Sequence, residues 1–140
     1  MQPFKYLEHT ADCKFQAYGD SMEQAFENAA LAMMNHLTPV DKIKSMVYKT
    51  INVKANQTDK LLYAFLEEFI FFIDTEGFIV GEIKSLTIDK TNEEYVLKAE
   101  VGGDTYKNYE VVGDIKAITY NDMFIEEKEG VWTVQVVIDI

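Results

Sequence analysis

The stretch SMEQAFENAALAMMNHL at residues 21–37 determines the architecture that we expect for this chain. Ser21, followed by Gln24 three residues later, has the pattern of a capping box at the start of a helix, and Thr38-Pro39 ends the helix. Apolar side chains recur at helical spacing and form one stripe: Met22, Ala25, Phe26, Ala29, Ala30, Met33 and Leu37. The sequence therefore predicts an amphipathic helix over residues 21–37.

A second helix is predicted over residues 59–73. Its apolar stripe consists of Leu62, Phe65, Leu66, Phe69, Ile70 and Ile73. The polar run 74–77, which finishes with Gly77, ends the helix. Because so much of this segment is apolar, we expect a broad face of the helix to pack against a sheet.

Most other segments alternate between apolar and polar residues with a period of two, which predicts strands. The expected strands cover residues 13–17, 47–53, 79–88, 95–101, 116–125 and 131–138. Gly102-Gly103-Asp104 predicts a turn, and residues 126–130 predict a hairpin loop. The order is two strands, a helix, a strand, a helix and several strands. This order predicts an α+β fold with a mainly antiparallel sheet and two principal helices packed on it.

Length and composition indicate one domain over residues 1–140. The chain has 140 residues, of which 48% are apolar, enough for a single core. It contains no apolar run of about 18 residues, and its first residues lack the pattern of a signal peptide, so we expect a cytoplasmic protein without membrane contact. Cys13 is the only cysteine and cannot form an internal disulfide.

The charge of the chain disfavours tight, direct binding to nucleic acid. Asp and Glu number 24 against 13 basic residues, every one of them Lys, and the net charge is -11. Arg side chains make most specific contacts to bases and phosphates, and a strongly negative protein repels a polyanion. A cation, or a basic surface on another protein, is the better expected partner.

The tetrapeptide H-T-A-D places His9 and Asp12 near the start of the fold. A short loop between two strands would bring both side chains near one point, where they could bind a cation or act as an acid/base pair. Alternatively, Thr10 and Asp12 close a turn by local hydrogen bonds and His9 bonds to backbone. The spacing alone leaves both interpretations open.

The end of the sequence, V-Q-V-V-I-D-I, offers a second group of oxygen atoms. Strand alternation places Asp139 on the face opposite Ile138 and Ile140. A carboxylate at Ile140, docked beside that of Asp139, would suit a hard cation such as Ca²⁺, Mg²⁺ or Mn²⁺. Ordinary fraying of a terminus is the alternative.

Three stretches of this sequence together resemble the archease family. They are H-T-A-D with the following F-Q-A-Y-G-D-S and the helix M-E-Q-A-F-E-N-A-A-L-A-M, then K-A-I-T-Y-N-D-M, and the closing W-T-V-Q-V-V-I-D-I. The stretches span the chain from end to end. The resemblance implies an α+β fold built around a strand, helix, strand, strand module, in agreement with the element order above.

The resemblance also implies a function. Archeases activate the RtcB-type tRNA-splicing RNA ligase by promoting its guanylylation, which permits repeated turnover in exon ligation. They are not themselves enzymes. The family is also associated with a chaperone-like role toward a tRNA cytosine methyltransferase. A metal-dependent hydrolase using His9 and Asp12 is a third reading, but it needs a nucleophile that the sequence does not identify.

Carried over by residue, the resemblance implies a metal site formed by Asp12, Asp139 and the carboxylate of Ile140, with Ca²⁺ as the expected ion. His9 need not be a ligand, because hard cations prefer oxygen, and it is expected to orient the loop or to hydrogen-bond a group behind the ligands. Lys116 in K-A-I-T-Y is a candidate contact to the partner. Many family members have Gly in place of Lys14 and His in place of Asn121, and neither position belongs to the oxygen site. If that His contacts the partner in other members, Asn121 would change the choice of partner or the strength of binding.

Overall fold

The computed structural model describes residues 1–8 and 12–140. Its elements follow the expected order. They are β1 (Phe4–Leu7), β2 (Asp12–Gly19), α1 (Met22–Asn35), the 3-10 turn η1 (Val40–Lys42), β3 (Val47–Ala55), α2 (Thr58–Glu76), β4 (Phe78–Thr91), β5 (Glu94–Thr105), the 3-10 turn η2 (Tyr106–Asn108), β6 (Ala117–Lys128) and β7 (Val131–Asp139).

Local sequence signals set the limits of both helices. The Ser21 hydroxyl accepts a hydrogen bond from the Gln24 backbone N–H at 3.1 Å, and the Gln24 side chain accepts one from Asp20 N–H at 2.6 Å. These bonds cap the start of α1. At the end of α2, Gly77 adopts the left-handed conformation, with a φ of 62°, that commonly closes a helix. Both predicted helices are confirmed, with small shifts at their ends.

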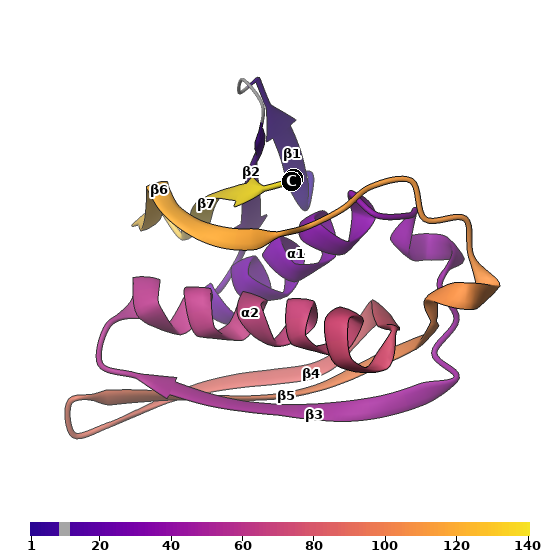
Figure 1. Cartoon of the computed structure of the whole chain (residues 1–140). Helices are drawn as coiled ribbons and strands as arrows, with labels where there is room; N and C mark the ends of the chain where they lie inside the picture. The colour runs from indigo at the N-terminus through magenta and orange to yellow at the C-terminus, as the bar shows by residue number, and fades with distance from the viewer. Residues whose placement is uncertain (9–11) are drawn as a thin grey trace.

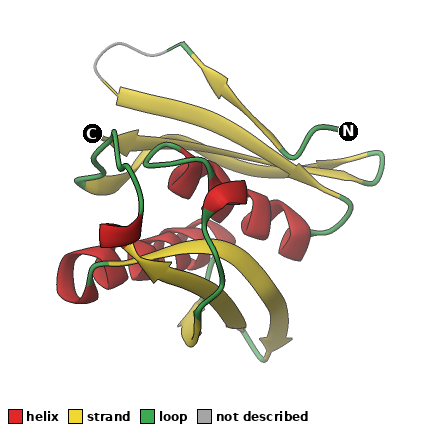
Figure 2. Ribbon diagram, turned by 90° about the vertical axis from the view of Figure 1, so that its right-hand side faces the viewer, coloured by secondary structure: helices red, strands yellow, loops and turns green. Residues whose placement is uncertain are grey.

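The strands divide between two antiparallel sheets. One sheet has the order β1-β2-β7-β6 and the other the order β3-β5-β4. Both helices lie in a layer between these sheets, as Figures 1 and 2 show: α1 packs against β2, β4 and β7, and α2 packs against β3 and β6. The expected α+β class with antiparallel pairing is confirmed, and the structure adds that the helices are covered on two sides.

Aromatic side chains fill the space between the helices. Phe26 of α1 stacks on Phe65 of α2 at 6.4 Å between ring centroids, and Phe65 meets Phe69 edge-on at 5.1 Å. All three side chains are completely buried. Aromatic pairs in these geometries stabilise a core beyond the area that they bury, so this cluster joins the two helices into one layer.

The turn predicted at Gly102-Gly103-Asp104 is wrong, because β5 continues through these residues to Thr105. The two glycines lie opposite Val47 and Tyr48 of β3, and opposite the irregular part of β4. A Cβ atom on Gly103 would overlap the carbonyl oxygen of Ile79. The glycines therefore permit close contact between neighbouring strands rather than a change of chain direction.

Candidate functional site

Asp12 and Asp139 lie directly opposite each other on neighbouring strands. Asp12 is the first residue of β2 and Asp139 the last of β7, and the antiparallel register pairs them. Directly opposed residues of an antiparallel pair point to the same face, with Cβ atoms about 5 Å apart. Two carboxylates separated by most of the chain thus lie side by side at one end of the four-stranded sheet.

The neighbouring main chain closes this end of the sheet. The Lys116 backbone N–H donates to the carbonyl oxygen of Asp139 at 2.8 Å, and Ala117 pairs with Asp139 across β6 and β7. Ile140 follows as a half-buried residue, while the Lys116 side chain is exposed. The end of β7 is therefore bonded to the start of β6 on one side, while Asp139 pairs with Asp12 on the other.

The sheet face that carries the two carboxylates is polar along β2. Lys14 lies 3.5 Å from the Asp122 carboxylate, measured from Nζ to Oδ2. Gln16 donates to the Gln135 side chain at 2.9 Å, and Gln135 donates to the carbonyl of Asp122 at 2.8 Å. These contacts fix β2, β7 and β6 relative to one another beside the two carboxylates.

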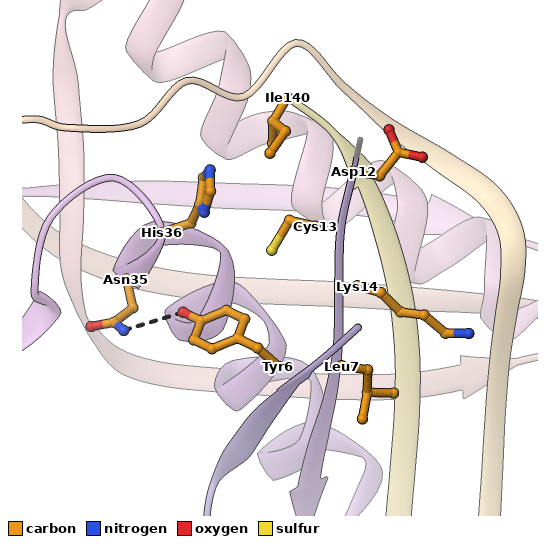
Figure 3. Close-up of a pocket in the computed structure, with 8 residues that line it drawn as sticks. All are labelled: Tyr6, Leu7, Asp12, Cys13, Lys14, Asn35, His36 and Ile140. Carbon is orange, nitrogen blue, oxygen red and sulfur yellow. Dashed lines mark hydrogen bonds between the residues drawn. The ribbon is translucent and has the colours of Figure 1, made fainter. Parts of the chain in front are cut away.

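A cavity of about 360 Å³ opens on the other side of β2. Its walls are Tyr6, Leu7, Asp12, Cys13, Lys14, Asn35, His36 and Ile140. In Figure 3, Cys13 points toward Tyr6 and His36, whereas Asp12 and Lys14 point to the opposite side of the strand. The Asp12 carboxylate therefore borders the cavity without facing its centre.

Two groups in the cavity have raised pKa values. Burial raises the pKa of the Cys13 thiol and, as its largest cause, the pKa of the Tyr6 hydroxyl. The Tyr6 hydroxyl donates to the carbonyl of Ala32 at 2.9 Å and accepts from Asn35 at 3.1 Å. A thiol with a raised pKa stays protonated at neutral pH and is a poor nucleophile. The Cys13 thiol and the Tyr6 hydroxyl therefore line the cavity as neutral hydrogen-bonding groups, not as nucleophiles.

The two carboxylates are suited to a hard cation, provided that the main chain adds oxygen ligands. Carboxylates directly opposite each other repel, and a divalent cation between them would remove that repulsion. Within residues 1–8 and 12–140, His, Cys, Asp and Glu side chains do not gather in groups of three or more that could hold a metal. A cation at this place would therefore need oxygen ligands besides the two carboxylates, and Ile140, which directly follows Asp139, is the candidate from the sequence.

The structure brings together three of the residues singled out in the sequence: Asp12, Asp139 and Ile140. Lys116 adjoins them through its backbone, and the prediction for His9 lies outside the described residues. Sequence reasoning missed the cavity, because Tyr6 and Asn35 belong to different elements and form no local motif. Within the part of the chain that the structure describes, neither helix is long and apolar enough to cross a membrane.

Comparisons with known proteins agree on one family. Residues 4–140 match the model of the archease protein family. The protein archease of Pyrococcus furiosus is 38% identical over 143 residues, an alignment that covers all of both chains. The solution structure of protein 1598 of Methanobacterium thermoautotrophicum superposes with a TM-score of 0.86 at 30% identity over all of both chains. A crystal structure of a Thermotoga maritima archease, described as a possible chaperone, shares the fold with a TM-score of 0.59 at 23% identity, covering 97% of this chain and 96% of that one.

Proposed function

Because the chain belongs to the archease family, we propose that it is a non-enzymatic activator of the RtcB-type tRNA-splicing RNA ligase. In this proposal it promotes guanylylation of the ligase and thereby repeated turnover in tRNA exon ligation. One observation carries the proposal to particular residues: Asp12, the last residue of the H-T-A-D motif, pairs with Asp139 of the closing D-I motif.

The proposed site holds a divalent cation between Asp12, Asp139 and the main-chain oxygens of Ile140. Carboxylate and main-chain oxygens are the ligands that Ca²⁺ prefers, and Mg²⁺ or Mn²⁺ would use the same atoms with fewer protein ligands. The cation would join the start of β2 to the end of β7. It would also remove the repulsion between two opposed carboxylates.

The proposed activator works by binding one state of the ligase better than another. A protein can shift a conformational equilibrium only through such a difference in affinity. The cation-bearing end of the sheet would contact the conformation that accepts GMP, close to the ligase's own metal and nucleotide pocket. Lys116 is the candidate cationic contact at this end, because its side chain is exposed while its backbone is bonded to Asp139.

The test is multiple-turnover RNA ligation by the ligase of the same organism, with GTP and Mn²⁺ and with this protein at substoichiometric concentration. Asp139→Asn keeps the size of the side chain and removes its charge. Asp89→Asn, at an exposed position of β4 in the other sheet, is the matched control. We expect the wild type and Asp89→Asn to accelerate turnover and Asp139→Asn to fail.

Two results would count against the proposal. If the wild type does not accelerate ligation, the ligase is not its target. Suppression of methyltransferase aggregation by the same preparation would then favour the chaperone-like role toward a tRNA cytosine methyltransferase. If Asp139→Asn activates as well as the wild type, activation does not depend on the paired carboxylates.

A further inference from the structure

Two tyrosines form a stacked pair where α2 passes β6. The rings of Tyr63 and Tyr120 lie 4.4 Å apart between centroids and 13° from parallel. Tyr63 is half-buried, whereas Tyr120 remains 51% exposed. Because Tyr63 covers one face of the Tyr120 ring, the exposed area of Tyr120 is concentrated on its other face and its edge. One face of the Tyr120 ring is thus open to solvent, while the Tyr63 ring packs against the other face.

An irregularity in β6 positions Tyr120. The pairing with β7 passes from Thr119 opposite Val137 to Phe124 opposite Gln135, so β6 carries extra residues at this point. Asp122 has a φ of 53°, and its carbonyl accepts the Gln135 side-chain N–H at 2.8 Å. The left-handed conformation is uncommon for a residue other than glycine. Bulges of this kind re-aim side chains and are frequent beside functional sites.

Carboxylates lie beside the tyrosine pair along α2. Asp59 and Glu67 stand four residues before and four residues after Tyr63, so all three share one side of the helix. The pKa of the Tyr120 hydroxyl is raised by burial and then by Asp59, Tyr63 and Glu67. Both carboxylates therefore lie close enough to the Tyr63–Tyr120 pair to interact electrostatically with the Tyr120 hydroxyl.

We propose that Tyr63, Tyr120, Asp59 and Glu67 form a binding surface for the basic side chains of a protein partner. The negative face of an aromatic ring attracts a guanidinium or ammonium group, and Arg also stacks on such a face. Flanking carboxylates add charge-assisted hydrogen bonds to the same cation. The chain itself contains no Arg, so a guanidinium at this place has to come from another molecule.

The charges on this surface select a basic peptide over a nucleic acid. An exposed tyrosine could stack on a base, but carboxylates on both sides of the pair would repel the adjacent phosphates. Asp59 and Glu67 are separated by eight residues of helix, or about 12 Å along its axis. A segment with several basic residues can therefore place one on Tyr120 and others near the carboxylates.

This surface is distinct from the paired carboxylates at the end of the sheet. Asp139 pairs with Ala117, three residues before Tyr120 on β6. Tyr120 instead contacts α2, which packs on the inner face of the sheet (Figure 1). The inference therefore stands without the ligase proposal and is tested without the ligase.

The experiment is an NMR titration of the full chain with the peptide acetyl-Arg-Gly-Arg-Gly-Arg-amide. The matched probe is the same peptide with citrulline in place of each Arg, which keeps the shape of the side chain and removes its charge. We expect saturable shifts of the Tyr63 and Tyr120 ring resonances with the Arg peptide, weaker at higher salt. We expect no comparable shifts with the citrulline peptide.

Variants then distinguish the contribution of the Tyr120 ring to peptide binding from that of the neighbouring carboxylates. Tyr120→Leu removes the aromatic face while keeping an apolar contact with Tyr63, and should weaken peptide binding about fivefold, the effect of an exposed cation–π contact of about 1 kcal/mol. Tyr120→Phe should bind within about twofold of the wild type. Replacing both Asp59 and Glu67 by their amides should weaken binding further and reduce its dependence on salt.

Several outcomes would overturn the inference. Equal shifts with the citrulline peptide would show that charge is irrelevant, and shifts confined to other acidic surfaces would place the peptide elsewhere. Wild-type affinity in Tyr120→Leu would mean that the ring does not bind the cation. Unchanged unfolding midpoints, followed by Trp132 fluorescence, establish that each variant is folded, so that a loss of binding is a local effect.

Discussion

Replacing Asp139 by Asn should change the stability of the fold in opposite directions with and without Ca²⁺. In a chelator, the substitution removes a like-charge contact with Asp12 across β2 and β7. Opposed like charges on neighbouring strands destabilise by about 0.2–1 kcal/mol. The free energy of unfolding should therefore rise slightly in the variant, by no more than about 1 kcal/mol. The main-chain bond from Lys116 to the Asp139 carbonyl is kept in the variant.

With Ca²⁺ present, the sign should reverse. A ligand that binds only the folded state stabilises it by RT ln(1 + [L]/Kd), or about 2.7 kcal/mol at a hundredfold excess over Kd. The wild type should gain that amount at a saturating concentration, and Asp139→Asn should gain much less because it has lost a charged ligand. The variant should then be less stable than the wild type by about 2 kcal/mol.

Urea unfolding measures the free energy of unfolding with and without Ca²⁺. Trp132 fluorescence can report it, because Trp132 lies on β7, the strand that ends at Asp139. The comparison uses the wild type, Asp139→Asn and the exposed control Asp89→Asn, each in chelator and in Ca²⁺. The control should stay within about 0.5 kcal/mol of the wild type in both conditions. Equal stabilisation of the wild type and Asp139→Asn by Ca²⁺, or no stabilisation of the wild type, would show that Asp139 does not bind the cation.

Three further predictions concern the rest of the fold. Gly103→Ala should destabilise by about 1–3 kcal/mol in urea unfolding, because its Cβ would overlap the Ile79 carbonyl oxygen; wild-type stability would contradict the close approach of β4 and β5. Phe65→Ala should cost about 3–5 kcal/mol in the same assay, since it empties a fully buried position between the helices; a loss below about 1 kcal/mol would mean that this core is loosely packed. Hydrogen bonds, first from Asn108, lower the pKa of Asp104, so its stabilising contribution is present above the ordinary Asp pKa and is lost as the pH falls through the lower folded-state pKa. Asp104→Asn should therefore flatten the acid limb of the curve of stability against pH, and an unchanged limb would contradict this.

The helices were predictable because their signals are local. Ser21 and Gln24 form the expected cap within one turn, and the apolar stripe of residues 22–37 is the face that the structure buries. The start of α2 was also predicted to within one residue. Helix caps and stripes depend on side chains within a few residues of one another, so they can be read without knowledge of the fold.

Features that depend on distant contacts could not be predicted in this way. Gly102-Gly103 looked like a turn because the neighbours that approach it, β3 and β4, lie elsewhere in the sequence. Residues 120–123 were predicted as part of a regular strand. The hydrogen bond that holds the irregularity in place comes from the Gln135 side chain on β7, which is distant in the sequence. Nothing in the alternation of residues 116–125 reveals where a register shift will fall.

In the candidate site, too, local features were predictable and the contact between distant residues was not. Alternation correctly placed Asp139 and Ile138 on opposite faces of β7, but only the resemblance to a family connected Asp12 with Asp139. Their meeting depends on the pairing of β2 with β7, a contact between the two ends of the chain. Neither periodicity nor composition determines which strands of an antiparallel sheet become neighbours.

The most direct test of the proposed function is the rate at which the RtcB-type ligase becomes covalently guanylylated after one round of sealing. The measurement follows transfer of labelled GMP from GTP to the ligase, with the wild-type protein, Asp139→Asn or Asp89→Asn present at substoichiometric concentration. We expect faster transfer with the wild type and with Asp89→Asn, and the unassisted rate with Asp139→Asn. Transfer at the unassisted rate with the wild type, or at the accelerated rate with Asp139→Asn, would contradict the proposed function.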